Sequence, residues 1–340
     1  MNPTPMTLLI TQGDPCGIGP EIIAKTFAAG AAPDCCVAGD VGVMRRAIRQ
    51  CGLTLPVVQV GVVSELVPPN CLPVWQVPGL GEELAALPMG TIDACAGAAA
   101  ARCIEAAVAQ VLQGHAAGVV TAPIHKEALH AAGVPFPGHT EMLQFLAAQG
   151  GAMPPVRMML ANDELRTVLV TIHCSLRTAI DQISCESVLQ TLRISHQALR
   201  RFGLAQPRIA VAGLNPHAGE GGLFGDEEVL HIAPAIRLAQ AEGIHASGPF
   251  APDTVFMRAR HTATHPGEFD VVVAMTHDHG LIPVKYLGVE QGVNVTLGLP
   301  FVRTSPDHGT AFDIAGQGEA DPASLQAAIR MARRLSSPGP

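Results

Sequence analysis

Aromatic residues are scarce in this chain, with one Trp, one Tyr and ten Phe among 340 residues. The core must therefore be built mainly from Ala, Val, Leu and Gly, as in tightly packed α/β layers. Charged residues are also few, at 15%, whereas hydrophobic residues reach 48%, which excludes an intrinsically disordered chain and predicts a sizeable core. A chain of this length suits one large α/β domain or two interlocked ones.

No run of Lys or Arg occurs and the net charge is −8, which excludes the basic surface of a nucleic-acid-binding protein. No apolar run approaches the length of a membrane span, and no signal peptide is visible, so we expect no membrane partner. The nine cysteines are odd in number and contain no C-x-x-C spacing, which favours reduced thiols in a cytoplasmic protein.

Short apolar segments typical of strands alternate with Ala-rich segments typical of helices. Strands are predicted at residues 7–12, 35–39, 117–121, 156–161, 165–172, 208–212 and 270–275. Helices are predicted at residues 20–29, 93–112, 184–201, 226–241 and 322–335. This alternation predicts an α/β fold with a largely parallel sheet, in which 156–161 and 165–172 could pair as a hairpin. Polar chemistry is expected on the Gly- and Pro-rich loops at the strand ends.

The first such loop is Gly13–Glu21, between a predicted strand and helix. Backbone N–H groups of a glycine-rich turn can meet an anion at a helix start. A Rossmann fingerprint with Asp40 as the ribose ligand is one interpretation. The third glycine is absent, however, and Pro20 lacks an N–H group, so a tight structural turn is the other interpretation.

A second motif combines the segment Thr121–Glu127 with Pro137–Glu141. Thr140 precedes a helical stretch and could cap it. His139 beside it could instead bind a hydroxyl or phosphate of a substrate, and the spacing leaves both readings open.

Three histidines, His173, His217 and His277, lie on separate loops at predicted strand ends. A catalytic divalent metal needs about three protein ligands, and neutral imidazoles suit Zn²⁺ and similar ions. The chain contains 14 His, and these three have no local spacing motif, so surface or hydrogen-bonded roles remain the alternative.

Lys285, Asn294 and Arg303 stand in strongly apolar surroundings near the C-terminus. Two cations with a neutral amide can clamp a phosphate or carboxylate, whereas the plainer interpretation is three solvated side chains. The loop Asp307–Gly318 follows, and it is either a connection or a cofactor-binding loop.

Taken in order along residues 7 to 334, these motifs resemble the 4-hydroxythreonine-4-phosphate dehydrogenase family of the vitamin B6 pathway. The most specific segments are Gly13–Glu21, Gly138–Glu141, Gly213–Gly222 and Gly292–Pro300. His308–Gly316 is similar to the adenosine-binding loop of isopropylmalate and isocitrate dehydrogenases. The resemblance implies their α/β fold, with two subdomains and an active site in a cleft. Residues 1–128 plus 280–340 would form the first subdomain, with the cofactor loop. Residues 129–279 would form the second, with the metal ligands and the contact of a homodimer whose active site is shared.

The resemblance also implies the role of each site residue. The metal ligands would be His173, His217 and His277. The substrate-binding residues would be His139, Thr140, Lys285, Asn294 and Arg303. The catalytic residues would be Asp253 and His139, and the residues that bind NAD or NADP would be His308, Gly309 and Asp313.

The implied reaction is metal-dependent oxidation of a phosphorylated hydroxy acid, 4-phosphohydroxy-L-threonine, followed by decarboxylation. Zn²⁺ is the expected metal, with Mg²⁺ or Co²⁺ as alternatives. One other function is that of a paralogous dehydrogenase for a 4-phosphoerythronate- or threonate-type acid, and a remote one is a phosphate acyltransferase of related fold. Four departures from the family pattern bear on this choice of substrate and metal: Cys16, Cys174, Thr276 and His279.

Overall fold

The computed structural model describes residues 7–336, which form two compact α/β units. Unit 1 comprises the chain up to Pro154 together with Leu299–Ser336, and unit 2 comprises Pro155–Gly298. The boundaries predicted from the sequence lay at 128/129 and 279/280. The observed boundaries lie later because α5 (His139–Ala148) packs on α3 (Ala94–Leu112) in unit 1, while α10 (His277–Tyr286) packs on strands of unit 2.

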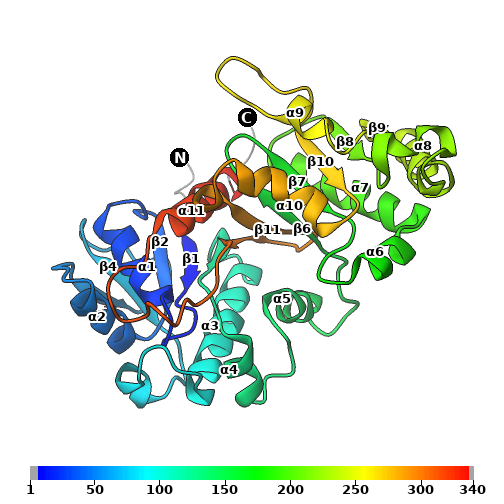
Figure 1. Ribbon diagram of the computed structural model, residues 1–340. Helices are drawn as coiled ribbons and strands as arrows, with labels where there is room; N and C mark the ends of the chain where they lie inside the picture. Colours follow the sequence, from blue (N-terminus) through cyan, green and yellow to red (C-terminus); the bar gives the residue numbers. More distant parts are fainter. Residues whose placement is uncertain (1–6, 337–340) are drawn as a thin grey trace. The chain divides into compact units, whose positions relative to one another are not determined.

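Six strands of unit 1 lie in the order β3-β4-β2-β1-β5-β12. Figure 1 labels β4, β2 and β1 of this series. The bounds of the six strands are β1 Leu8–Thr11, β2 Cys35–Gly39, β3 Val57–Val60, β4 Leu72–Gln76, β5 Gly118–Thr121 and β12 Val302–Pro306. All these pairings are parallel. The remaining elements are α1 Gly19–Ala28, α2 Val41–Gln50, η1 Glu82–Ala86, α3, α4 Lys126–Ala131, α5 and α11 Ala323–Ser336.

Every residue of β1, β2 and β5 is buried, as expected for parallel strands covered on both faces. From β1 the chain crosses to β2 on one side of β1. From β4 it crosses to β5, which lies on the other side of β1. Right-handed crossovers in opposite directions place α1 and α3 on opposite faces of these strands. The core between α3 and the sheet is rich in small residues such as Cys103 and Ala107, which agrees with the scarcity of aromatics.

The six strands of unit 2 lie in the order β11-β6-β7-β10-β8-β9 (Figure 1). Their bounds are β6 Arg157–Ala161, β7 Arg166–Leu169, β8 Ile209–Ala212, β9 Ala246–Phe250, β10 Val271–Ala274 and β11 Val293–Leu297. The predicted hairpin is confirmed, since β6 pairs antiparallel with β7, whereas β7, β10, β8 and β9 run parallel. The other elements are α6 Leu176–Gln182, α7 Cys185–Arg201, η2 Pro216–Gly222, η3 Glu228–Ile232, α8 Ala233–Ala241, α9 Val255–Ala259, α10 and η4 Val289–Gln291.

One helix bears on the expectation that no segment spans a membrane. Helix α3 is long and apolar enough, by length and composition, to cross a membrane. Arg102 and Glu105 interrupt its apolar sequence. The helix packs on β1, β2 and β5, and half of it is buried. Core helices of soluble proteins meet the same criteria, so this is weak evidence for a span.

Candidate active site

In unit 2, three predicted site histidines follow the carboxyl ends of three adjacent parallel strands. His173 lies after β7, His277 after β10 and His217 after β8. The backbone pairing of β7 and β10 continues past the strands, because the N–H and hydroxyl of Thr171 both donate to the Met275 carbonyl, at 3.2 and 2.8 Å. This continuation places His173 and His277 side by side.

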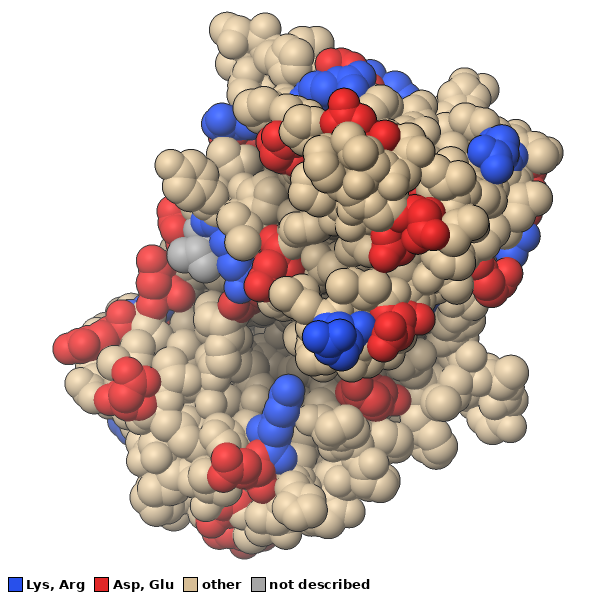
Figure 2. Space-filling model, turned by 45° about the vertical axis from the view of Figure 1, so that its right-hand side comes forward, with Lys and Arg blue, Asp and Glu red and all other residues tan. Residues whose placement is uncertain are grey.

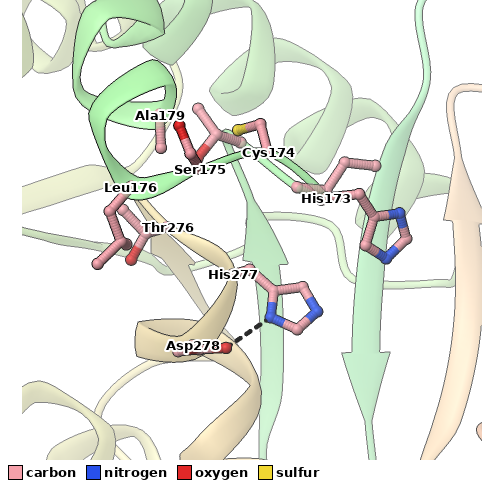
Figure 3. A pocket seen from close by; sticks show the side chains of 10 residues that line it. His173, Cys174, Ser175, Leu176, Ala179, Thr276, His277 and Asp278 are labelled. Atoms are coloured by element: carbon pink, nitrogen blue, oxygen red, sulfur yellow. Dashed lines mark hydrogen bonds and ion pairs between the residues drawn. The ribbon is translucent and has the colours of Figure 1, made fainter.

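The rings of His173 and His277 lie with their centroids 5.6 Å apart and at an angle of 47° (Figure 3). They line a cavity of about 360 Å³, here called the histidine pocket, whose wall also includes Cys174, Ser175 and Leu176. Nδ1 of His277 lies 2.7 Å from the Asp278 carboxylate, as the dashed line in Figure 3 shows. A carboxylate on Nδ1 fixes the ring and leaves Nε2 as the ligand nitrogen.

His217 does not line the histidine pocket. It lines a neighbouring cavity of about 620 Å³ together with Asp253, Asp278 and His279, here called the Asp253 pocket. Among residues 7–336, no three His, Cys, Asp or Glu side chains are grouped as a metal-binding set. The structure therefore brings two of the three predicted ligands together and leaves the third on the loop of the next strand.

The loop that carries His217 is held by a buried carboxylate that sequence reasoning missed. Glu228 is 3% exposed, and its Oε1 accepts the N–H groups of Leu214 and Asn215 at 2.7 and 2.8 Å. Glu228 begins a π-helical turn inside the predicted helix 226–241, and such turns are frequent at functional sites. The backbone of His217 has φ of 53°, so this loop is constrained in a left-handed conformation.

Two predicted substrate residues also lie in unit 2. Lys285 is exposed in the last turn of α10, and Asn294 is the second residue of β11, paired with Leu160. Neither lines the two pockets described above.

In unit 1, the other predicted substrate residues are Arg303 on β12 and the pair His139 and Thr140 at the start of α5. Arg303 is 4% exposed and donates through Nη2 to the Thr121 hydroxyl at 2.7 Å, at the end of β5. Burial lowers the pKa of Arg303 to about 10, so it stays charged at neutral pH. His139 and Thr140 open α5, whose N-cap is Gly138, so Thr140 does not cap this helix, which was one of the two roles left open.

The His139 side chain is neutral next to Arg303. Burial, and then the positive charge of Arg303, lower the pKa of His139 well below its usual value. Its Nε2 is buried and has no hydrogen-bond partner among the described residues. A neutral imidazole next to a buried guanidinium can accept a proton or a hydrogen bond from a ligand.

The predicted cofactor loop, 307–318, packs on the Gly13–Glu21 turn. The Ile18 N–H donates to the Thr310 carbonyl at 3.0 Å, and the Gly316 N–H donates to the Glu21 carboxylate. His308 directs Nδ1 to the Gly309 carbonyl at 3.0 Å, and Asp313 is exposed. Asp40 caps α2 and accepts from Val43 N–H and Gln76 Nε2, so the Rossmann interpretation of Asp40 is wrong.

The four residues that depart from the family pattern differ in burial and in the pocket that they line. Cys16 is fully buried, and burial raises the pKa of its thiol to about 11. Cys174 and Thr276 both line the histidine pocket. His279 lines the Asp253 pocket, and its Nδ1 is buried without a partner among residues 7–336.

The surface carries charges of both signs in small groups. On the face shown in Figure 2, Lys and Arg side chains alternate with Asp and Glu and form no broad basic area. This distribution agrees with the net charge of −8 and offers no nucleic-acid footprint on that face.

Comparisons with family models, known sequences and solved structures agree on one family. A model of the family "Pyridoxal phosphate biosynthetic protein PdxA" matches residues 31–332. A 4-hydroxythreonine-4-phosphate dehydrogenase of Beijerinckia indica is 55% identical over 98% of this chain and 96% of its own. A D-threonate 4-phosphate dehydrogenase of Pectobacterium atrosepticum is 42% identical over 97% and 99%. The crystal structure of a 4-hydroxythreonine-4-phosphate dehydrogenase from Klebsiella pneumoniae superposes with a TM-score of 0.90, at 42% identity and 99% coverage of both chains.

Proposed function

The chain belongs to the PdxA family of pyridoxal phosphate biosynthetic proteins, a family of dehydrogenases, and from that premise we propose that it oxidises 4-phosphohydroxy-L-threonine with NAD or NADP and a divalent metal. The observation that carries this proposal is the His173–His277 pair at the carboxyl ends of adjacent strands, in a chain that is 55% identical to a dehydrogenase of that name. The localisation proposed for this enzyme is the cytoplasm.

The donor set of unit 2 fits a divalent ion such as Zn²⁺. His173 and His277 would hold it, with the His277 ring oriented by Asp278, and His217 on the Glu228-held loop would be the third ligand. Such an ion, when bound, lowers the pKa of a substrate hydroxyl. We propose that Asp253 takes the hydroxyl proton, because its exposed carboxylate lines the same pocket as His217.

The substrate phosphate would be bound by cationic and neutral donors. Arg303 remains charged despite its burial, and Lys285 and Asn294 complete the predicted set in unit 2. His139 is neutral, so it would accept a hydrogen bond from the substrate without adding charge repulsion beside Arg303. Loop 307–318 would hold NAD or NADP through His308, Gly309 and Asp313. A fixed phosphate orients the carbinol for hydride transfer.

A second candidate substrate is D-threonate 4-phosphate, since relatives with that name are 42% to 45% identical over nearly the whole chain. Cys174, Thr276 and His279 line the two pockets of unit 2 and could favour an acid without the amino group. The higher identity to a 4-hydroxythreonine-4-phosphate dehydrogenase favours the amino acid.

NAD(P)H formation by the zinc-loaded chain tests the proposal. We expect turnover of 4-phosphohydroxy-L-threonine to exceed that of D-threonate 4-phosphate and 4-phosphoerythronate at equal concentration. His173→Ala and His277→Ala should each lower kcat/KM at least about a hundredfold, because ligand loss removes the metal's charge stabilisation of several kcal/mol. His115→Ala, an exposed histidine outside both pockets, is the matched control and should retain activity.

Preferential turnover of an acid that lacks the amino group would replace the proposed substrate with the second candidate. Full activity of the His173 and His277 variants would contradict the proposed metal site. Absence of turnover of all three acids, in protein that demonstrably binds metal and NAD(P), would overturn the substrate class.

A further inference from the structure

The crevice between the carboxyl ends of β1 and β5 is a topological switch point of unit 1. The two strands are adjacent and parallel. The second neighbour of β1 is β2, on one side, and the second neighbour of β5 is β12, on the other side. Open α/β sheets bind ligands at such points, just outside the carboxyl ends of the strands. The residues that follow the two strands here are Gln12–Asp14 and Ala122–His125.

Buried polar atoms without partners gather at this crevice. Asp14 is fully buried, and its Oδ1 accepts the Cys16 N–H at 2.8 Å, but its Oδ2 has no partner among the described residues. Thr11 Oγ1 and His125 Nδ1 are likewise buried and unpaired within residues 7–336. Each such group costs about 1–3 kcal/mol of stability, so a set of them in one crevice indicates that something else hydrogen-bonds them.

His125 and the turn that follows Asp14 are in contact with loop 307–318. The His125 ring stacks on Phe312, with centroids 4.6 Å apart and planes 13° from parallel. The Asp14 turn is also fastened to the loop, since a Cβ on Gly17 would lie 2.9 Å from the Thr310 Cβ. Asp14, His125 and the loop therefore form one site within unit 1.

The charges at this site favour hydroxyl groups over an anion. Asp14 interacts electrostatically with His125, Cys16 and Asp93, and Asp93 adds a second negative charge, while the buried Arg46 donates to the Pro15 carbonyl next to it. A phosphate would be repelled by both carboxylates, whereas a ribose diol can donate to a carboxylate oxygen, as it does to the acidic residue of Rossmann folds. Asp40, the residue that would do this in a Rossmann fold, is occupied in capping α2.

We propose that Asp14, together with His125, binds the hydroxyl groups of a ribose of NAD(P). This inference rests on the proposed dehydrogenase function and extends it to two residues outside the family-implied set. Because Asp14 Oδ2 is buried, the site must open locally for the ribose to reach it. Phe312 would then leave the face of His125.

Calorimetric titration of the full-length chain tests this inference, with NADH, AMP, nicotinamide mononucleotide and the 2′,3′-dideoxy forms of both mononucleotides as ligands. Asp14→Asn should bind NADH about 10- to 100-fold more weakly, because hydrogen bonds to a charged group contribute roughly 1.5–3 kcal/mol. The wild type should bind one of the two mononucleotides more tightly than its dideoxy form, which identifies the ribose. Asp14→Asn should discriminate less strongly between the normal and dideoxy forms of that mononucleotide, because His125 and the Asn carbonyl remain as partners.

Two further variants separate this role from a structural one. Glu127→Gln, on the exposed first turn of α4, removes one negative charge from the neighbouring segment and should leave NADH binding unchanged. His125→Phe keeps a ring for the stack on Phe312 but lacks Nδ1, and it should weaken NADH several-fold.

Equal NADH affinity in wild type and Asp14→Asn overturns the inference alone. The same holds if Asp14→Asn still discriminates against the dideoxy form as strongly as the wild type does. A wild type that binds neither NADH nor NADPH in the presence of zinc overturns the proposed function and this inference together.

Discussion

Asp14 is a single residue whose burial has a measurable consequence for stability. Burial raises its pKa to about 6, although the Cys16 N–H and the His125 charge oppose the shift and Asp93 adds to it. The folded chain therefore holds this proton more tightly than the unfolded chain does. The contribution of Asp14 to stability is fully present below its unfolded pKa near 4 and is lost as pH rises through 6.

Asp14→Asn should remove this pH dependence. Relative to the variant, the wild type should lose up to about 3 kcal/mol of unfolding free energy between pH 4 and pH 8, at about 1.4 kcal/mol per pKa unit. Urea unfolding of both proteins across this range measures the difference. A constant difference between the two proteins at all pH values would show that Asp14 titrates normally.

The residues that sequence reasoning identified are those whose side chains follow strand ends. His173, His277 and His217 were recognised as candidates because each ends a buried segment, and parallel pairing then puts the three on one edge. Asp14, His125, Asp278 and Glu228 received no role. Their importance depends on burial and on hydrogen bonds to distant backbone, such as Glu228 with Leu214, and spacing along the chain does not reveal these.

At the scale of elements, fully buried strands and long capped helices were predictable. Segment 35–39 matches β2 residue for residue, and Asp93 and Ser184 cap α3 and α7 as their side chains suit them to do. Strand β4 escaped prediction because Pro73 stands within it, and β3 because it is short and only partly buried. The helix expected at 226–241 begins as a π-helical turn because the buried Glu228 bonds the His217 loop.

Helix α3 depends on one glycine for its contact with α4. A Cβ on Gly97 would lie 2.1 Å from the backbone oxygen of Ala128, closer than any packing allows. Gly97→Ala should therefore destabilise the chain by about 1–3 kcal/mol through overpacking, despite a helix-propensity gain of about 1 kcal/mol.

Thermal and urea unfolding would measure the effect of Gly97→Ala. Ala98→Gly, at the exposed neighbouring position of α3, reports the propensity difference alone and should cost about 1 kcal/mol. A Gly97→Ala protein more stable than the wild type would mean that α3 and α4 can separate freely.

For the whole molecule, composition and alternation predicted the α/β class, whereas the division into two units came from the family resemblance. The unit boundaries depend on which elements α5 and α10 pack against, and this is a tertiary property that local patterns do not contain. Small core residues such as Ala107 and Ala210 fill both units, as the scarcity of aromatics required.

The proposed homodimer is testable through an apolar face on unit 2. Leu176 and Ile180, one helical turn apart on α6, are 66% and 43% exposed, and Leu176 lines the histidine pocket. Isolated exposed apolar residues are ordinary, but a pair on one helix face beside a candidate active site suits a contact with a second copy. We expect the wild type to sediment as a dimer at micromolar concentration and Leu176→Asp/Ile180→Asp to sediment as a monomer.

Leu66→Asp is the matched control for this prediction, because Leu66 is 92% exposed in unit 1. It introduces one Asp, where the double variant introduces two, at a more exposed leucine and should leave the dimer intact. If the site is shared between copies, the specific activity of the wild type should fall at least about tenfold on dilution below the dimer dissociation constant, since a closed two-fold interface would then complete each site. A dimer that survives the double substitution places the contact elsewhere, and a wild-type monomer with undiminished activity means that one chain supplies every catalytic group by itself.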